Sequence, residues 1–152
     1  MNAKRIAGVA TLVLALACIH ASSADTPQPV KLSKDQIKGS VFKDYEPVVK
    51  ETKSERGPFT TRDVEAFLSS DKHFDAGIYN AGPNRFTVSE PYGVDEFMYF
   101  LKGGVTLTSE DGTVHEINAG DAVIIPKEWK GVWDTDGYTK IYVIYSPDEP
   151  IE

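Results

Sequence analysis

The chain is short of cysteine. Its only cysteine, Cys18, lies in an N-terminal segment with two basic residues, Lys4 and Arg5, an apolar run over 6–19 and small residues ending at Ala24. This order is typical of a secretory signal peptide, and the apolar run is too short for a stable membrane span. Cleavage after Ala24 leaves no cysteine, so the stability of the remaining chain must come from packing and not from disulfides.

A second use of the same segment stays open. Cys18 ends the run "LALAC", so attachment of a lipid at this cysteine is an alternative to cleavage after Ala24. Leu16 is larger than the residues usual before a lipid-modified cysteine, and an uncleaved segment is the third option. With residues 1–24 removed, we expect a periplasmic or secreted protein.

Positive charge is also scarce. Sixteen basic residues stand against twenty-three acidic ones, for a formal charge of −7. Removal of Lys4 and Arg5 leaves fourteen basic residues and a charge of −9. No basic cluster offsets this excess, which argues against nucleic acid and anionic membrane surfaces as partners. The 128 residues that remain of the 152 are enough for one domain with one core.

Residues 25–59 lack a sustained apolar period of two or of 3.6. We therefore predict an N-terminal arm, part of which packs on the domain through Val41, Phe42, Tyr45, Val48 and Val49. The next segment, "TTRDVEAFLSS" over 60–70, predicts one short helix, because a threonine precedes acidic residues and an apolar stripe of Val64, Phe67 and Leu68.

From residue 74 onward the sequence is a series of short apolar or alternating segments, each closed by a turn signal. They cover 74–80, 85–90, 94–101, 105–109, 113–117, 122–126, 129–134 and 138–145. Such even spacing predicts an antiparallel sandwich or small barrel. With the leading helix, we assign residues 60–152 to this domain.

Two of these segments resemble the conserved blocks of the cupin superfamily. "EFMYFLKG" has a glutamate, six residues and a glycine, at Glu96 and Gly103, and "INAGDAVIIP" supplies Gly120, Asp121 and Pro126. The resemblance implies an all-β double-stranded β-helix, the cupin or jelly-roll barrel.

The run "IPKEWKGVWD" narrows the resemblance to the cupin subgroup named after ureidoglycine aminohydrolase. Lys130, Gly131 and Trp133 fall on matching positions, whereas Glu128 replaces a usual glycine. The resemblance extends over residues 74–145. It implies hydrolysis of a carbon–nitrogen bond in a small ureide, an activity that uses a bound metal in those relatives.

Metal-binding cupins hold their ion with three histidines and the glutamate. Here the segment before Glu96 reads "SEPYGVD", and the histidine position of the second block is Gly131. His73 and His115 match neither block. We therefore expect no specific transition metal, although a weak oxygen site could be built from Glu90, Tyr92 and Glu96.

Trp129, Gly131 and Trp133 share one face of a predicted strand. If this face looks into the barrel, the glycine leaves a gap between two indoles. A ligand could fill this gap, which makes an aromatic pocket, or the tryptophans could plug the barrel themselves.

Glu96 shares a strand face with Val94, Met98 and Phe100, which predicts a carboxylate in an apolar interior. Burial would raise its pKa and suit a general acid or base. The alternative is a permanent partner in Tyr92, Lys130 or a backbone amide. The candidate ligand-binding residues are Tyr92, Glu96, Met98, Trp129, Lys130 and Trp133, with Glu96 as the candidate catalytic residue.

The opposite face of this strand is also apolar, with Phe97, Tyr99 and Leu101, and the segment 141–145 has no polar face. Strands that are apolar on both sides must be covered twice. The cover is either the arm or a second copy of the chain, and we predict a homodimer.

Three functions follow from these residues. The first is an exported, metal-free cupin barrel that binds a small molecule. The second is an enzyme resembling ureidoglycine aminohydrolase. The third is a metal-free isomerase or epimerase with Glu96 as base and Tyr92 or Lys130 as its partner.

Overall fold

The computed structural model describes residues 26–152, so the predicted signal peptide and Cys18 lie outside the described residues. A short helical segment, η1 (Gln36–Ser40) and α1 (Val41–Asp44), precedes the strands. The strands are β1 (Val48–Ser54), β2 (Gly57–Leu68), β3 (Phe74–Ala81), β4 (Asn84–Val88), β5 (Asp95–Ser109), β6 (Val114–Asn118), β7 (Ala122–Ile125), β8 (Gly131–Thr135) and β9 (Tyr138–Tyr145). No helix in this part of the chain is long and apolar enough to cross a membrane.

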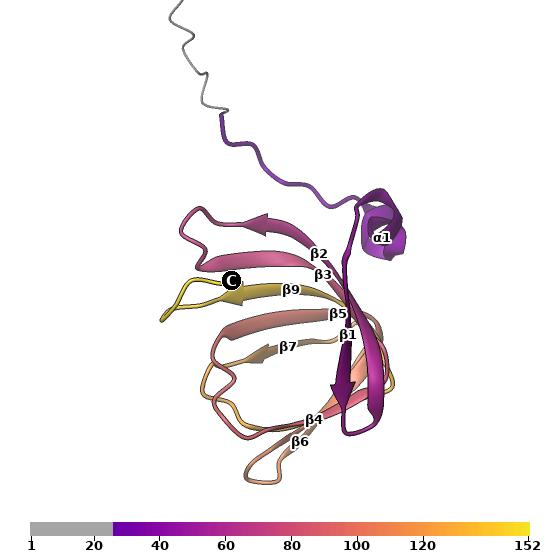
Figure 1. Ribbon diagram of the computed structural model, residues 1–152, viewed down its shortest axis with the longest axis vertical. Helices are drawn as coiled ribbons and strands as arrows, with labels where there is room; N and C mark the ends of the chain where they lie inside the picture. The colour runs from indigo at the N-terminus through magenta and orange to yellow at the C-terminus, as the bar shows by residue number, and fades with distance from the viewer. Residues whose placement is uncertain (1–25) are drawn as a thin grey trace, which may run out of the picture.

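The strands form one antiparallel sheet in the order β1-β2-β3-β9-β5-β8-β4, with β6 and β7 also paired to β5. The sheet curls into a nearly closed barrel (Figure 1). At the seam, the amide of Glu55 donates to the carbonyl of Arg85 over 3.0 Å, and Arg56 donates to the carbonyl of Thr135 over 2.9 Å. This architecture confirms the predicted all-β barrel, and its one short helical segment lies outside the segment predicted to be helical.

Strand β5 joins the two halves of the barrel. Its first half pairs with β7 and β9, and its second half pairs with β6 and β8. The register with β9 shifts between Phe100 and Lys102, and such a bulge bends a strand. A Cβ at Gly103 would lie 2.0 Å from the Gly137 carbonyl oxygen, so the close approach at this bend requires a glycine. The segments 94–101 and 105–109 are therefore one bent strand and not two.

The predicted helix over 60–70 is wrong, because this segment belongs to β2. Strand β2 pairs with β1 on one side and with β3 on the other, so backbone pairing overrides the helical spacing of Val64, Phe67 and Leu68. Residue 59, the predicted end of the arm, lies inside the same strand, and β1 is part of the sheet.

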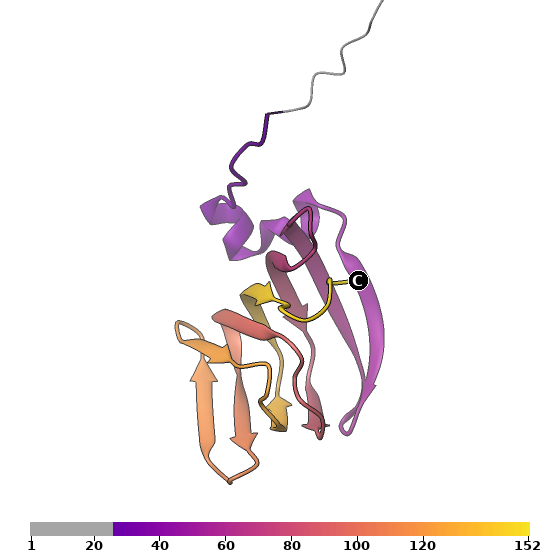
Figure 2. The same cartoon turned by 90° about the vertical axis from the view of Figure 1, so that its left-hand side faces the viewer.

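The helical segment packs on the outside of the barrel (Figure 2). Val41 is fully buried there in a cluster with Val64 and Ile78, against which Leu101 and Ile141 also pack. Phe42 joins this cluster, as predicted, whereas Tyr45, Val48 and Val49 are exposed. The arm thus covers one part of the outer face of β5 and β9.

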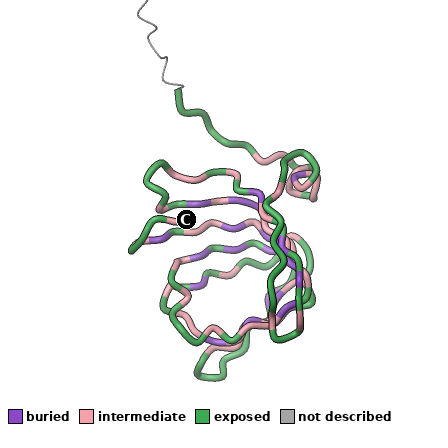
Figure 3. Tube along the Cα trace, viewed as in Figure 1, coloured by how far each residue is buried: buried purple, intermediate pink, exposed green. Residues whose placement is uncertain are grey.

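The main core lies inside the barrel, where buried residues recur along the strands (Figure 3). Met98 and Phe100 on β5 are fully buried in it, beside Trp133 and Tyr138. On the opposite face of β5, Phe97 and Tyr99 remain exposed, as does Ile124 on β7. The alternation along β5 therefore places Glu96 on the interior face.

Candidate functional site: a barrel cavity with a buried ion pair

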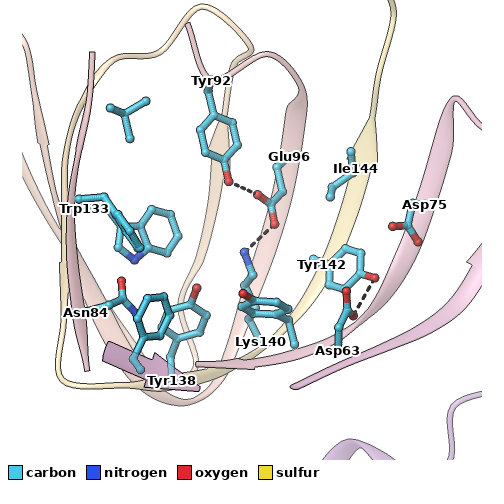
Figure 4. A pocket seen from close by; sticks show the side chains of 14 residues that line it. Asp63, Asp75, Asn84, Tyr92, Glu96, Trp133, Tyr138, Lys140, Tyr142 and Ile144 are labelled. Carbon is cyan, nitrogen blue, oxygen red and sulfur yellow. Dashed lines mark hydrogen bonds and ion pairs between the residues drawn. The ribbon is translucent and has the colours of Figure 1, made fainter. Parts of the chain in front are cut away.

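The barrel interior contains a cavity of about 330 Å³ (Figure 4). Strands β2, β3, β4, β5, β8 and β9 contribute to its wall, together with Tyr92 from the segment before β5. Its aromatic lining residues are Phe59, Tyr79, Phe86, Tyr92, Trp133, Tyr138 and Tyr142. Its ionisable lining residues other than tyrosine are Asp63, Asp75, Glu96 and Lys140. An apolar wall with a few polar groups is the usual form of a small-molecule site.

A buried ion pair forms one wall of the cavity. Lys140 Nζ lies 2.6 Å from Glu96 Oε1, and the two residues are only 5% and 3% exposed. Lys140 pairs with Phe100 across β5 and β9, so its long side chain reaches along the interior to Glu96. Both charges are out of water, and each is compensated chiefly by the other.

Tyr92 holds the second oxygen of Glu96. Its hydroxyl donates to Oε2 over 2.5 Å. Burial and the neighbouring charge of Glu96 raise the pKa of Tyr92 well above its ordinary value, so the hydroxyl keeps the proton that it donates. The Tyr92 amide donates to the carbonyl of Trp129, whose indole meets the Tyr92 ring edge-on at 6.3 Å. Glu96 therefore has a fixed partner on each carboxylate oxygen.

Aromatic rings and a thioether surround the ammonium of Lys140. Nζ lies 3.0 Å from Met98 Sδ and 5.4 to 5.6 Å from the ring centroids of Tyr79, Trp133 and Tyr138. Ring faces attract a cation, most strongly where water is excluded. The charge on Lys140 is thus held by one carboxylate and a cage of soft groups.

A second polar group lies across the cavity, at β2 and β3. The hydroxyl of Tyr142 donates to Asp63 Oδ1 over 3.1 Å, and Asp75 lies nearby with only 7% of its surface exposed (Figure 4). Burial, followed by the charges of Glu65 and Asp63, raises the pKa of Asp75 to about 6. Burial also raises the pKa of Asp63. Asp75 Oδ1 has no hydrogen-bond partner among the described residues.

Three of the predicted ligand-binding residues, Tyr92, Glu96 and Trp133, line the cavity. Met98 contacts Lys140 but is not part of the lining, and Trp129 packs behind Tyr92 and donates to Ser109 Oγ. Lys130 does not line the cavity.

The lysine that binds Glu96 is therefore Lys140 and not Lys130, which corrects the predicted alternative. Alternation in "YTKIYVIY" could have revealed it, since it places Tyr138, Lys140, Tyr142 and Ile144 on one face. These four residues line the cavity, so the 141–145 segment has an interior face with a tyrosine hydroxyl. Asp63 and Asp75 gave no comparable local signal.

Gly131 does not leave an open gap. A Cβ at this position would lie 2.2 Å from the Thr108 carbonyl oxygen and 2.8 Å from Trp129 Cζ2. The backbone of β5 and the indole of Trp129 therefore fill the space that a side chain would need. A histidine, the residue usual here in metal-binding cupins, has no room.

We predict that Gly131→His destabilises the protein by about 1–3 kcal/mol through overpacking and creates no metal site. Chemical denaturation and a zinc titration measure the two effects. Gly82→Ala is the matched control, because its Cβ would meet its nearest neighbour at 3.7 Å, an ordinary contact. A Gly131→His protein that is as stable as the control and binds zinc tightly would show that the position is open.

The described residues do not fit a transition-metal site. Within 26–152, no three side chains of the histidine, cysteine, aspartate or glutamate type form a group that could hold an ion. His73 contacts the carbonyl of Ser146, and His115 is exposed on β6. The one carboxylate at the cupin metal position, Glu96, already binds Lys140 and Tyr92.

Comparison with known proteins agrees with this fold. The family model of the EutQ-like cupin domain matches residues 68–142. A DUF861 family protein from Pseudomonas syringae is similar with a TM-score of 0.58 at 18% identity, over 64% of this chain and 44% of that one. Ectoine synthase from P. lautus is similar with a TM-score of 0.51 at 15% identity, over 68% and 70% of the two chains.

A DUF861 family protein from Thermotoga maritima is 32% identical over 43% of this chain and 73% of that one, with a TM-score of 0.39. No curated protein matches the chain. The match to the Pseudomonas protein covers 44% of that protein, so this chain spans less than half of its length. Residues 68–142, just under half of the chain, thus match a cupin domain in sequence, and they fold into the all-β barrel described above.

Proposed function

We propose that this protein is a small-molecule-binding cupin that works without a metal, with the ammonium of Lys140 as the cation bound to Glu96. The observation that carries the proposal is the 2.6 Å pair of these residues in the wall of an aromatic cavity of about 330 Å³. In metal-binding cupins the equivalent glutamate helps to hold the ion. Here a side chain of the protein itself supplies the positive charge.

This arrangement supports binding better than catalysis by Glu96. A general base must reach the proton of its substrate, whereas each oxygen of Glu96 already accepts a donor and the residue is only 3% exposed. Two catalytic alternatives therefore have less support. The first is acid–base catalysis by Glu96, and the second is a metal-dependent hydrolase that resembles ureidoglycine aminohydrolase. Acid–base chemistry at Asp75 is the second candidate, because this carboxyl has a pKa of about 6 and a free oxygen in the cavity.

Mass spectrometry of small molecules released from the full chain, purified from its own cells without an affinity tag, tests the proposal. We expect one compound in stoichiometric amount from the native protein. Ile144→Trp should abolish its retention, because Ile144 lines the cavity and a larger side chain would occupy it. Val114→Trp, at an exposed position on β6, is the matched control and should retain it. Equal retention in both variants, or none in the native protein, would contradict binding in the cavity.

We also propose export, with cleavage after Ala24 and a periplasmic or secreted location. The N-terminal segment "MNAKRIAGVATLVLALACIHASSA" supports this step. The mass of the mature protein from its own cells tests it: loss of residues 1–24 is expected, and a chain that keeps them contradicts it.

We further propose a homodimer through the outer face of β5 and β7. Phe97, Tyr99 and Ile124 are exposed there, beyond the part that the arm covers. Light scattering should give twice the chain mass for the native protein, and Ile124→Glu should shift it toward the monomer, because a buried unpaired charge opposes association. A native protein that is monomeric at micromolar concentration rules out this dimer.

A further inference from the structure

We infer that the cavity selects a small ligand that carries a cationic nitrogen group, an amine or an amidine, held at Asp63 and Asp75. This inference rests on the proposed function and adds the chemical class of the ligand. Three features of the cavity support it: unpaired acceptors, an excess of negative charge, and the size and lining of the space.

The first feature is a pair of buried acceptors without donors. Asp75 Oδ1 and Asn84 Oδ1 have no hydrogen-bond partner among the described residues, and both residues line the cavity. Asp75 is 7% exposed and Asn84 only 2%. The amide of Asn84 is oriented by its Nδ2, which donates to the Gly82 carbonyl over 2.8 Å, so Oδ1 is the atom left over. Buried polar atoms in folded proteins nearly always have partners, and both atoms here need a donor.

The second feature is the charge. Three carboxylates, Asp63, Asp75 and Glu96, line the cavity with one ammonium, Lys140. Lys140 neutralises Glu96 at 2.6 Å, and Asp63 receives only the neutral hydroxyl of Tyr142 at hydrogen-bond distance. Two carboxylates are thus left for a ligand, and an opposite charge next to them would be stabilised in a site of low polarity.

The third feature is the space itself. At about 30 Å³ per water molecule, 330 Å³ suits a ligand of on the order of ten non-hydrogen atoms. Asp63 and Asp75 lie on one side of the cavity, whereas Trp133 and Asn84 lie on the other (Figure 4). Ring faces such as those of Trp133 and Tyr138 suit a flat apolar body. The cavity therefore fits a planar molecule with a cationic end.

Ligand binding should also depend on pH. Asp75 is faced by Asp63 and Glu65 from β2 and by Tyr142 from β9, with Lys140 deeper in the cavity. Its pKa of about 6 means that it loses its proton between weakly acidic and neutral pH. A cationic ligand should bind more tightly once Asp75 is ionised, so its affinity should fall as the pH is lowered through about 6.

Calorimetric titration of the full chain with three probes of similar size tests the inference. Benzamidine is cationic, benzoate is anionic, and benzyl alcohol is neutral. Near pH 7.5, benzamidine should bind at least about tenfold more tightly than either other probe, as a charge-assisted hydrogen bond implies. Asp75→Asn should reduce the affinity for benzamidine by about tenfold and remove its pH dependence. Asp148→Asn, an exposed surface change, is the control and should alter neither.

The outcomes separate the two proposals. Binding of benzoate or benzyl alcohol as tight as that of benzamidine overturns the cationic preference and leaves a small-molecule site standing. An Asp75→Asn protein with native affinity for benzamidine overturns the assignment to this carboxylate. If none of the three probes binds, the cationic preference fails, and the compound released from the native protein decides the proposed binding function.

Discussion

Replacement of Lys140 by methionine is expected to lower the free energy of unfolding by about 3–5 kcal/mol, the range for removal of one partner of a buried pair. Methionine keeps the length and the apolar stem of lysine but leaves Glu96 charged at 3% exposure, with Tyr92 as its remaining partner. Urea denaturation near neutral pH measures the loss.

Two further variants show whether this loss of stability comes from the unpaired charge of Glu96. Lys127→Met breaks the exposed pair between Lys127 and Asp148, which has the similar distance of 2.7 Å, and should cost no more than about 1 kcal/mol. Adding Glu96→Gln to Lys140→Met removes the unpaired charge and should restore most of the lost stability. A Lys140→Met protein that loses no more than the Lys127→Met protein would show that Glu96 does not depend on this lysine.

Asp75→Asn is expected to stabilise the protein at neutral pH by up to about 3 kcal/mol. The pKa of Asp75 is about 6 in the folded chain and its ordinary value is 3.8. The unfolded chain therefore gives up this proton near pH 4, whereas the folded chain keeps it until about pH 6. Between about pH 4 and pH 6, ionisation of this carboxyl therefore lowers the free energy of unfolding progressively as the pH rises. Above about pH 6 the full loss of stability remains. Asparagine does not titrate, so it removes the penalty.

The difference in unfolding free energy between native protein and Asp75→Asn should therefore be small near pH 4 and largest at neutral pH. Comparison of the two proteins at each pH cancels the titration of the other carboxyl groups. Asp148→Asn, at an exposed pair, should show no such trend. If the native protein instead gains stability relative to Asp75→Asn between about pH 4 and neutral pH, Asp75 is not a buried carboxyl with a raised pKa.

A buried carboxylate that lowers the stability of the fold is expected in a binding site whose ligand requires it.

Much of the fold follows from local patterns. Turn signals between short alternating segments predicted most of the barrel strands, and the period of two along β5 placed Glu96, Met98 and Phe100 inside. A helix was wrongly predicted over 60–70 because Val64, Phe67 and Leu68 also fit a helical spacing. Its state was decided by pairing with β1 and β3, and such non-local pairing leaves no signal within the segment itself.

The residues of the site were harder to predict from the sequence, for a similar reason. Tyr92 lies four residues before Glu96, so their contact could be expected from nearby positions. Lys140 is forty-four residues away, and it meets Glu96 only through the register of β5 with β9. Asp63 and Asp75 reach the cavity from two other strands, and their burial depends on how the sheet closes. Local alternation could indicate an interior face, but not which interior residues meet.

The cation bound to Glu96 can be identified most directly by metal analysis of the full chain. The protein is purified without an affinity tag, incubated with manganese, iron or zinc, freed of loose ions by gel filtration and measured by elemental mass spectrometry. With Lys140 as the partner of Glu96, no stoichiometric metal should remain bound to the native protein. A stoichiometric ion that is retained by the native chain and lost in Glu96→Gln would contradict that pairing.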